Sequence, residues 1–134
     1  MSLFADTSVW SLALRRDTQH PAPEVGALAN ALARGQTVFV AGLVLQELLQ
    51  GLSGPKARMQ IIERFAKLPL LSPDIQDHIE AAELRNHCRR SGVQIATVDV
   101  LFAQLCIRYD LTMLATDKDF TYLARHSALR LWSP

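Results

Sequence analysis

The sequence is poor in the features that mark secreted or membrane-anchored proteins. It has only two cysteines, Cys88 and Cys106, without CxxC spacing, and both are expected to be buried free thiols in a reducing compartment. The first residues lack a positively charged segment followed by a long apolar run, so no signal peptide is predicted. The longest apolar run, residues 38–45, is far too short to span a membrane. These absences predict a cytoplasmic protein with no membrane association.

An excess of charge and the common nucleotide-binding motifs are also missing. The net charge is +1, whereas proteins that hold nucleic acid mainly by charge are strongly basic. Any nucleic-acid site must therefore be local or must neutralise phosphate with bound cations. The chain has no GxxxxGK[ST], GxGxxG or GxSxG motif. The histidines have no HxxxH spacing and are expected on the surface rather than as metal ligands: His20, His78, His87 and His126.

What is present predicts one α/β domain spanning residues 1–134, long enough to bury a core. Short apolar runs predict strands at residues 3–5, 38–40, 70–71, 112–115 and 129–132, the last at a sheet edge. Helical patterns predict helices at residues 9–14, 23–34, 44–52, 56–68, 73–91, 97–107 and within 117–125. Ser72 is expected to cap the fifth helix with Pro73 at its first position, and residues 15–23 form a loop. This alternation predicts a mainly parallel sheet.

Acidic residues recur where the predicted strands give way to helices. Asp6 follows the first strand, and Glu47 lies in the helix after the second. Asp99 stands at the start of the most apolar helix, and Asp117 comes just after the strand at 112–115, with Asp119 two residues later. Ligands of parallel α/β sheets bind outside the carboxyl ends of the strands. If these strands are neighbours, the acids converge on one edge.

Each acid also has an ordinary explanation. Asp6 and Asp99 could cap helices or interact with helix dipoles, Asp117 could stabilise a turn, and Glu47 could be a solvent-exposed helix residue. Taken together, clustered carboxylates repel one another unless cations lie among them. An all-oxygen site suits Mg²⁺ or Mn²⁺, and such ions activate water and bridge phosphate oxygens. The residues therefore favour a metal-dependent phosphodiesterase, without choosing between RNA and DNA.

Three segments together resemble the PIN-domain ribonucleases, and more narrowly the VapC-type toxins of bacterial toxin–antitoxin pairs: "LFADTSVW", "VAGLVLQELLQGL" and "IATVDVLFAQLCIRYDLTMLATDKDF". The resemblance implies a three-layer α/β/α sandwich and RNA cleavage by metal-activated water. It implies that the catalytic, metal-binding acids are Asp6, Glu47, Asp99 and Asp117. It also implies that Ser8 supports Asp6 by a hydrogen bond, and it leaves open whether Asp119 joins the site.

The resemblance further implies an RNA substrate, such as transfer RNA or ribosomal RNA, and a cognate antitoxin that holds the toxin inactive. It implies a homodimer, with higher assemblies when the antitoxin is bound. The leucine-rich helix around residues 43–52 is a candidate surface for an antitoxin helix. Arg15, Arg16 and Lys118 are candidates for contacts to phosphates beside the cut. The alternative is a catalytically silent PIN-like module that binds RNA or a partner.

Overall fold

The sheet lies at the centre of the molecule. In the computed structural model, which describes residues 1–15, 22–52 and 54–134, five strands form one sheet in the order β3-β2-β1-β4-β5. Every neighbouring pair is parallel, so the predicted mainly parallel sheet is confirmed. The strands are β1 Leu3–Ala5, β2 Val38–Ala41, β3 Leu70–Leu71, β4 Thr112–Leu114 and β5 Arg130–Leu131. As predicted, the last strand lies at an edge.

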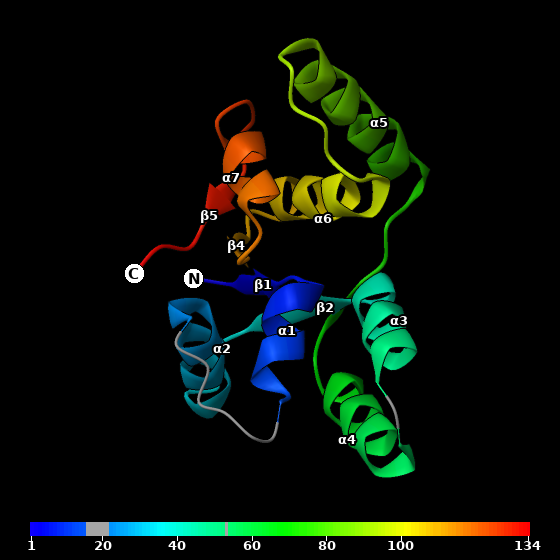
Figure 1. Cartoon of the computed structure of the whole chain (residues 1–134), viewed down its shortest axis with the longest axis vertical. Coiled ribbons are helices and arrows are strands. Elements are labelled where there is room, and N and C mark those ends of the chain that lie inside the picture. The colour runs from blue at the N-terminus through cyan, green and yellow to red at the C-terminus, as the bar shows by residue number, and fades with distance from the viewer. Residues whose placement is uncertain (16–21, 53) are drawn as a thin grey trace.

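Helices cover both faces of the sheet. Within the described residues they are α1 Thr7–Ala13, α2 Pro23–Ala33, α3 Gly42–Gly51, α4 Pro55–Ala66, α5 Ile75–Arg90, α6 Thr97–Arg108 and α7 Lys118–Ala124. Figure 1 shows α1 to α4 on one side of the sheet and α5 to α7 on the other. This arrangement confirms the predicted three-layer α/β/α sandwich.

The most apolar segments occupy the positions with the most neighbours. The three residues of the central strand β1 are all buried, because helices cover both faces of a parallel sheet. In α6 every residue from Val100 to Cys106 is buried, which confirms that this helix belongs to the core. The ring of Phe102 packs on that of Phe4, with the centroids 5.4 Å apart, so α6 is seated directly on the central strand.

Several helices start earlier or later than predicted; α3, for example, begins at Gly42 rather than at residue 44. Asp74, not Ser72, caps α5, since its side chain accepts from the backbone N–H of Asp77 while the Asp77 carboxylate accepts from that of Asp74. This reciprocal capping box leaves Pro73 outside the helix. Asp77 is also paired with Arg108 of α6, which joins the two helices. The first helix begins at Thr7 rather than at residue 9, because Asp6 caps it.

The remaining expectations concern single residues. Both cysteines are buried and free, as predicted. His78 and His87 are exposed and His126 is partly exposed, while His20, Arg16 and most of the predicted loop at 15–23 lie outside the described residues. None of the helices in the described ranges is both long enough and apolar enough to cross a bilayer.

The contact between α6 and the sheet should contribute strongly to stability. Phe102→Ala removes a ring that is 1% exposed, and the lost burial and the remaining cavity should reduce the free energy of unfolding by about 3–5 kcal/mol. Tyr122→Ala is the control, because that ring is 42% exposed and its loss should cost less than about 1 kcal/mol. Urea denaturation measures both. Equal effects of the two substitutions would contradict this packing.

Candidate functional site

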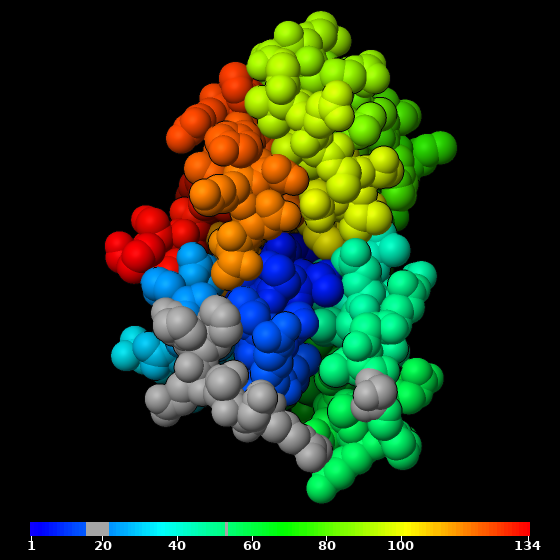
Figure 2. All heavy atoms as spheres, viewed as in Figure 1, coloured from blue at the N-terminus to red at the C-terminus, as the bar shows by residue number. Residues whose placement is uncertain are grey.

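The predicted acids are attached to elements that meet on one face of the molecule. Asp6 follows the central strand β1, and Asp117 follows its neighbour β4. Glu47 lies in α3, Asp99 in the first turn of α6, and Asp119 in the first turn of α7. Figure 2 shows atoms of the blue β1–α1 segment exposed between the blue-green α3, the yellow α6 and the orange α7. The topology thus brings all these elements to the carboxyl edge of the sheet, where ligands of parallel sheets bind.

Asp6 is held rigidly at the centre of this edge. Its backbone N–H donates to the carbonyl oxygen of Leu114 in β4, at 3.0 Å. Its carboxylate Oδ1 accepts from the Ser8 hydroxyl at 2.7 Å and from the Val9 N–H at 3.2 Å. Asp6 is therefore a helix cap, as the ordinary explanation proposed. Because both of these hydrogen bonds reach Oδ1, Oδ2 remains available to a ligand.

The other acids differ in how they are held. Asp99 does not cap α6, whose N-cap residue is Ala96, so capping does not explain its presence. Asp117 caps α7, where its Oδ1 accepts from the Asp119 N–H at 2.9 Å. Glu47 is exposed, and its Oε1 accepts from the Thr7 hydroxyl at 2.6 Å. Three of the four main acids, Asp6, Glu47 and Asp117, thus accept defined hydrogen bonds. The fourth, Asp99, lies close to them.

The carboxylates lie close enough to influence one another's protonation. Burial raises the pKa of Asp6 to about 6, with the charges of Asp99 and Asp117 adding to the increase, although hydrogen bonds from Ser8 and Val9 oppose it. Burial likewise raises the pKa of Asp99 to about 6, and the charges of Asp117, Glu47 and Asp119 contribute. These mutual interactions place all five predicted acids in one electrostatic cluster.

Among the described residues, no cationic side chain forms an ion pair with the cluster. The ion pairs formed within the described residues link Arg108 to Asp74 and Asp77, and Arg130 to Asp110; none involves the cluster. Carboxylate oxygens that lie near one another without a cationic side chain between them suit a hard divalent cation such as Mg²⁺ or Mn²⁺. In the part of the chain that is described, however, no three potential ligands are close enough to hold one ion as they stand. Binding would therefore draw the carboxylates toward the ion.

Two further residues at this edge, Thr7 and Thr116, contact the predicted site, although the sequence alone assigned them no role there. Thr7 bonds Glu47, and the hydroxyl of Thr116 lies 2.9 Å from that of Ser8. The predicted hydrogen bond from Ser8 to Asp6 is present, with a length of 2.7 Å. Thr7 lies next to Asp6 in "DTS", and Thr116 lies next to Asp117. In the sequence, this adjacency to predicted site acids is the feature that could have indicated a role for the two threonines. Their partners are 40 and 108 positions away, which no local pattern can indicate.

A family model for the PIN domain matches residues 3–126. The chain belongs to the PIN domain family. The resemblance to PIN domains drawn from the three sequence segments is thereby confirmed. A search of curated proteins finds no sequence match.

Solved structures share this PIN-domain fold over nearly their whole length. One is VapBC2 from Rickettsia felis bound to a promoter DNA fragment, with 21% identity, coverage of 98% of both chains and a TM-score of 0.76. FitAcB from Neisseria gonorrhoeae has 20% identity, coverage of 98% of this chain and 97% of that chain, and a TM-score of 0.67. VapC20 from Mycobacterium tuberculosis, described as a sarcin–ricin loop cleaving toxin, has 18% identity, coverage of 96% and 98%, and a TM-score of 0.71. At such identities the similarity shows the fold.

The raised pKa of Asp6 implies a measurable dependence of stability on pH. The folded state takes up a proton more readily than the unfolded state, so the ionised carboxyl destabilises the fold as the pH rises from about 4 through the folded pKa near 6. Asp6→Asn retains an oxygen that can accept from Ser8 and Val9 but has no charge. In metal-free buffer this variant should exceed the wild type in free energy of unfolding by about 3 kcal/mol at pH 8, and the difference should shrink toward pH 4.

Urea denaturation at several pH values tests this expectation. Asp110→Asn is the matched control, because Asp110 lies just before β4, at the opposite edge of the sheet, and its side chain is 86% exposed. Asparagine also tolerates the positive φ of 56° at that position. A stabilisation of Asp6→Asn that does not change with pH would contradict the proposed electrostatic cause.

Proposed function

We propose that the protein is a metal-dependent endoribonuclease that acts as the toxin of a toxin–antitoxin pair, in the manner of VapC. The observation that supports this most is the cluster of carboxylates at the carboxyl edge of the sheet, which has no protein cation among the described residues. Membership of the PIN domain family and the shared fold with VapC structures agree with it.

The chain's own residues divide the work in this proposal. Asp6 offers Oδ2 while Ser8 and Val9 hold Oδ1, and Asp99 and Asp117 face it closely enough to raise its pKa. Glu47, held by Thr7, completes the set and can bind the ion or orient a water molecule. A bound Mg²⁺ or Mn²⁺ supplies an activated water and stabilises the leaving oxygen of a phosphodiester. The buried Asp6 keeps that chemistry next to the sheet, while Glu47 and Asp117 lie at the exposed side of the site.

RNA is the substrate that we propose. VapC20, which shares the fold, is described as cleaving the sarcin–ricin loop, and ribosomal or transfer RNA loops are therefore the first substrates to test. Lys118 opens α7 beside Asp117, and Arg15 follows α1; both are exposed. These side chains are free to reach phosphates on either side of the cut. The net charge of +1 fits a protein that neutralises phosphate with bound cations as well as with side chains.

A silent PIN-like binding module is the second candidate. It is favoured by the absence, in the described ranges, of three ligands already close enough to share an ion. Such a module would retain RNA in the presence of a chelator and form no products at any concentration of Mg²⁺ or Mn²⁺.

Substitution of the central acids separates the two candidates. Asp6→Asn and Asp99→Asn should each abolish cleavage of a ribosomal or transfer RNA loop in Mg²⁺ or Mn²⁺, because each removes a charge that would hold the ion. Asp110→Asn should cleave like the wild type, since its carboxyl lies at the other edge of the sheet. Gel analysis of end-labelled RNA measures the products. Equal cleavage by all of these proteins would contradict the assignment of the site, and absence of cleavage by the wild type would favour the binding module.

The antitoxin is a further proposed partner. VapBC2 and FitAcB share this fold, and the resemblance to VapC-type toxins implies a cognate antitoxin for this chain. The predicted contact surface at residues 43–52 is less available than expected, because Val44 and Leu48 are buried in the core. A cavity of about 700 Å³ lies instead between α1, α2 and α4. Its lining combines apolar side chains, among them Trp10, Leu32 and Phe65, with polar and charged ones. Within the described residues, the buried Trp10 Nε1–H has no hydrogen-bond partner.

This cavity suits an amphipathic helix that brings apolar side chains and a hydrogen-bond acceptor. Ala57→Arg should fill it from α4, because Ala57 lines the cavity and arginine is a good helix former. The variant should lose co-purification with an antitoxin co-expressed from the adjoining reading frame, while its melting temperature stays near that of the wild type. Ala66→Arg, on the exposed end of the same helix, should keep the complex. Retention of the antitoxin by both variants would place the contact elsewhere.

We also propose that the protein forms the homodimer that the resemblance to VapC-type toxins implies. Leu70, Ile75 and Ile79 are large apolar residues with 60%, 79% and 47% of their surface exposed, and they follow one another from β3 into α5. Surfaces of this kind commonly contact other proteins.

A further inference from the structure

Two threonine hydroxyls connect the acidic edge to elements that are distant in the sequence. Thr7 Oγ1 donates to Glu47 Oε1 at 2.6 Å, which ties the first turn of α1 to the middle of α3. Thr116 Oγ1 lies 2.9 Å from Ser8 Oγ, which ties the segment after β4 to α1. Neither threonine belongs to the set of acids, yet each contacts that set or the residue that supports it.

Glu47 depends on Thr7 for its orientation. Its side chain is exposed and has several rotatable bonds, so burial does not restrict it. Within the described residues, the bond from Thr7 is the hydrogen bond that reaches its carboxylate. The charge of Glu47 acts on Asp99 and helps to raise the pKa of that residue. The Thr7 hydroxyl thus directs an otherwise free side chain toward the other acids.

The number of hydroxyl protons decides which residue donates in the hydrogen bond between Thr116 and Ser8. An ionised carboxylate can only accept, so the single hydroxyl proton of Ser8 goes to Asp6 Oδ1. The Thr116 hydroxyl must then be the donor in its contact with Ser8 Oγ. The chain of donors therefore runs from Thr116 through Ser8 to Asp6. It locks the Ser8 rotamer that, with the Val9 N–H, holds Oδ1, and among the described residues it leaves Oδ2 without a hydrogen bond.

We propose that Thr7 and Thr116 are positioning residues of this site, which keep Glu47 and, through Ser8, Asp6 beside the other acids, from where the carboxylates would move onto a divalent cation. The inference rests on the proposed function, because it assumes that the acidic edge takes up such an ion. Groups that orient metal ligands by hydrogen bonds change metal affinity by about 10–100-fold when they are removed. Thr7 is half-buried and Thr116 is exposed, so the hydroxyl, not the packing of the side chain, is the property at stake.

Valine and serine variants separate these two properties. Thr7→Val and Thr116→Val retain the shape of the side chain and remove the donor, whereas Thr7→Ser and Thr116→Ser retain the donor. Thr37→Val is the matched control, since Thr37 is exposed and lies just before β2, at the opposite edge of the sheet. All five variants are made in the full chain, and thermal melting checks that each is folded.

Two measurements are made on each protein. Titration calorimetry with MnCl₂ should show roughly tenfold weaker binding for each valine variant, affinity close to that of the wild type for each serine variant, and no change for Thr37→Val. In metal-free protein, NMR side-chain couplings should show one Glu47 rotamer in the wild type and in Thr7→Ser but several in Thr7→Val. The couplings of Ser8 should respond in the same way to Thr116→Val.

The outcomes are distinct. Manganese affinities of the valine variants equal to that of Thr37→Val, or unchanged rotamers in the metal-free proteins, would overturn the positioning roles. Weak binding by the serine variants as well would show that shape, not the hydroxyl, matters, and would also overturn them. A wild type that binds no manganese and cleaves no RNA would overturn the proposed function, while the metal-free couplings would still report whether the hydroxyls orient their partners.

Discussion

The burial of carboxylates close to one another at one edge of a parallel sheet is the constraint on which the rest of this structure depends. Burial and neighbouring charges raise the pKa values of Asp6 and Asp99 to about 6, so the ionised cluster destabilises the fold near neutral pH. The scaffold must therefore hold these groups together against their repulsion. It does so with backbone hydrogen bonds, with hydroxyl donors and with the packing of α6 on the central strand. A bound divalent cation would reverse the sign of this electrostatic interaction.

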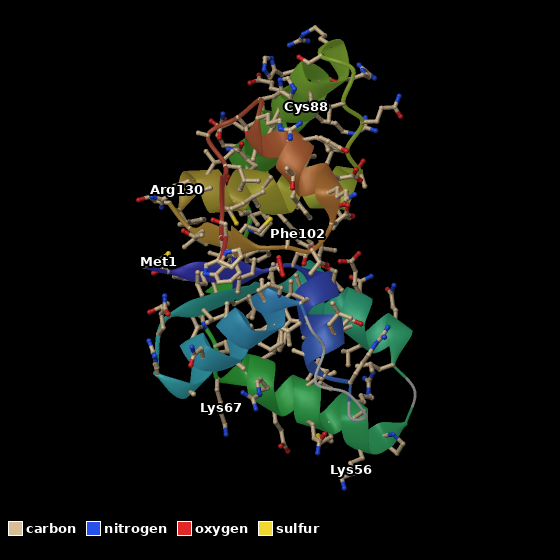
Figure 3. All side chains as sticks on the ribbon, turned by 60° about the vertical axis from the view of Figure 1, so that its left-hand side comes forward. Met1, Lys56, Lys67, Cys88, Phe102 and Arg130 are labelled. Atoms are coloured by element: carbon tan, nitrogen blue, oxygen red, sulfur yellow. The ribbon has the colours of Figure 1, made fainter. Side chains whose placement is uncertain are left out.

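The same residues serve the fold and the proposed chemistry. Asp6 begins α1 by accepting from Val9, and Asp117 begins α7 by accepting from Asp119. A cap uses one carboxylate oxygen, which leaves the other for a ligand. The buried face of α6 meets Phe4 of the central strand through Phe102, which lies between α6 and the sheet in Figure 3. Asp99, two residues into the same helix, is thereby fixed in relation to Asp6.

The two faces of the molecule have different proposed tasks. The carboxyl edge of the sheet, between α1, α3, α6 and α7, holds the acids. The cavity between α1, α2 and α4 is lined by apolar side chains together with polar and charged ones. Because α1 contributes to both, a partner bound in the cavity would contact the helix that Asp6 caps.

Local periodicity and the residue types at strand ends predict most of the helices and strands, and they place several acids where strands end. The family and the three layers came from the resemblance of three sequence segments to PIN domains. The strand order, the start of α5 at the Asp74–Asp77 capping box and the cavity became visible in the tertiary structure. The same is true of the hydrogen bonds between Thr7 and Glu47 and between Thr116 and Ser8. The reason is physical: each of these depends on side chains that meet only after the chain has folded, and no short-range pattern encodes a hydrogen bond between residues 40 or 108 positions apart.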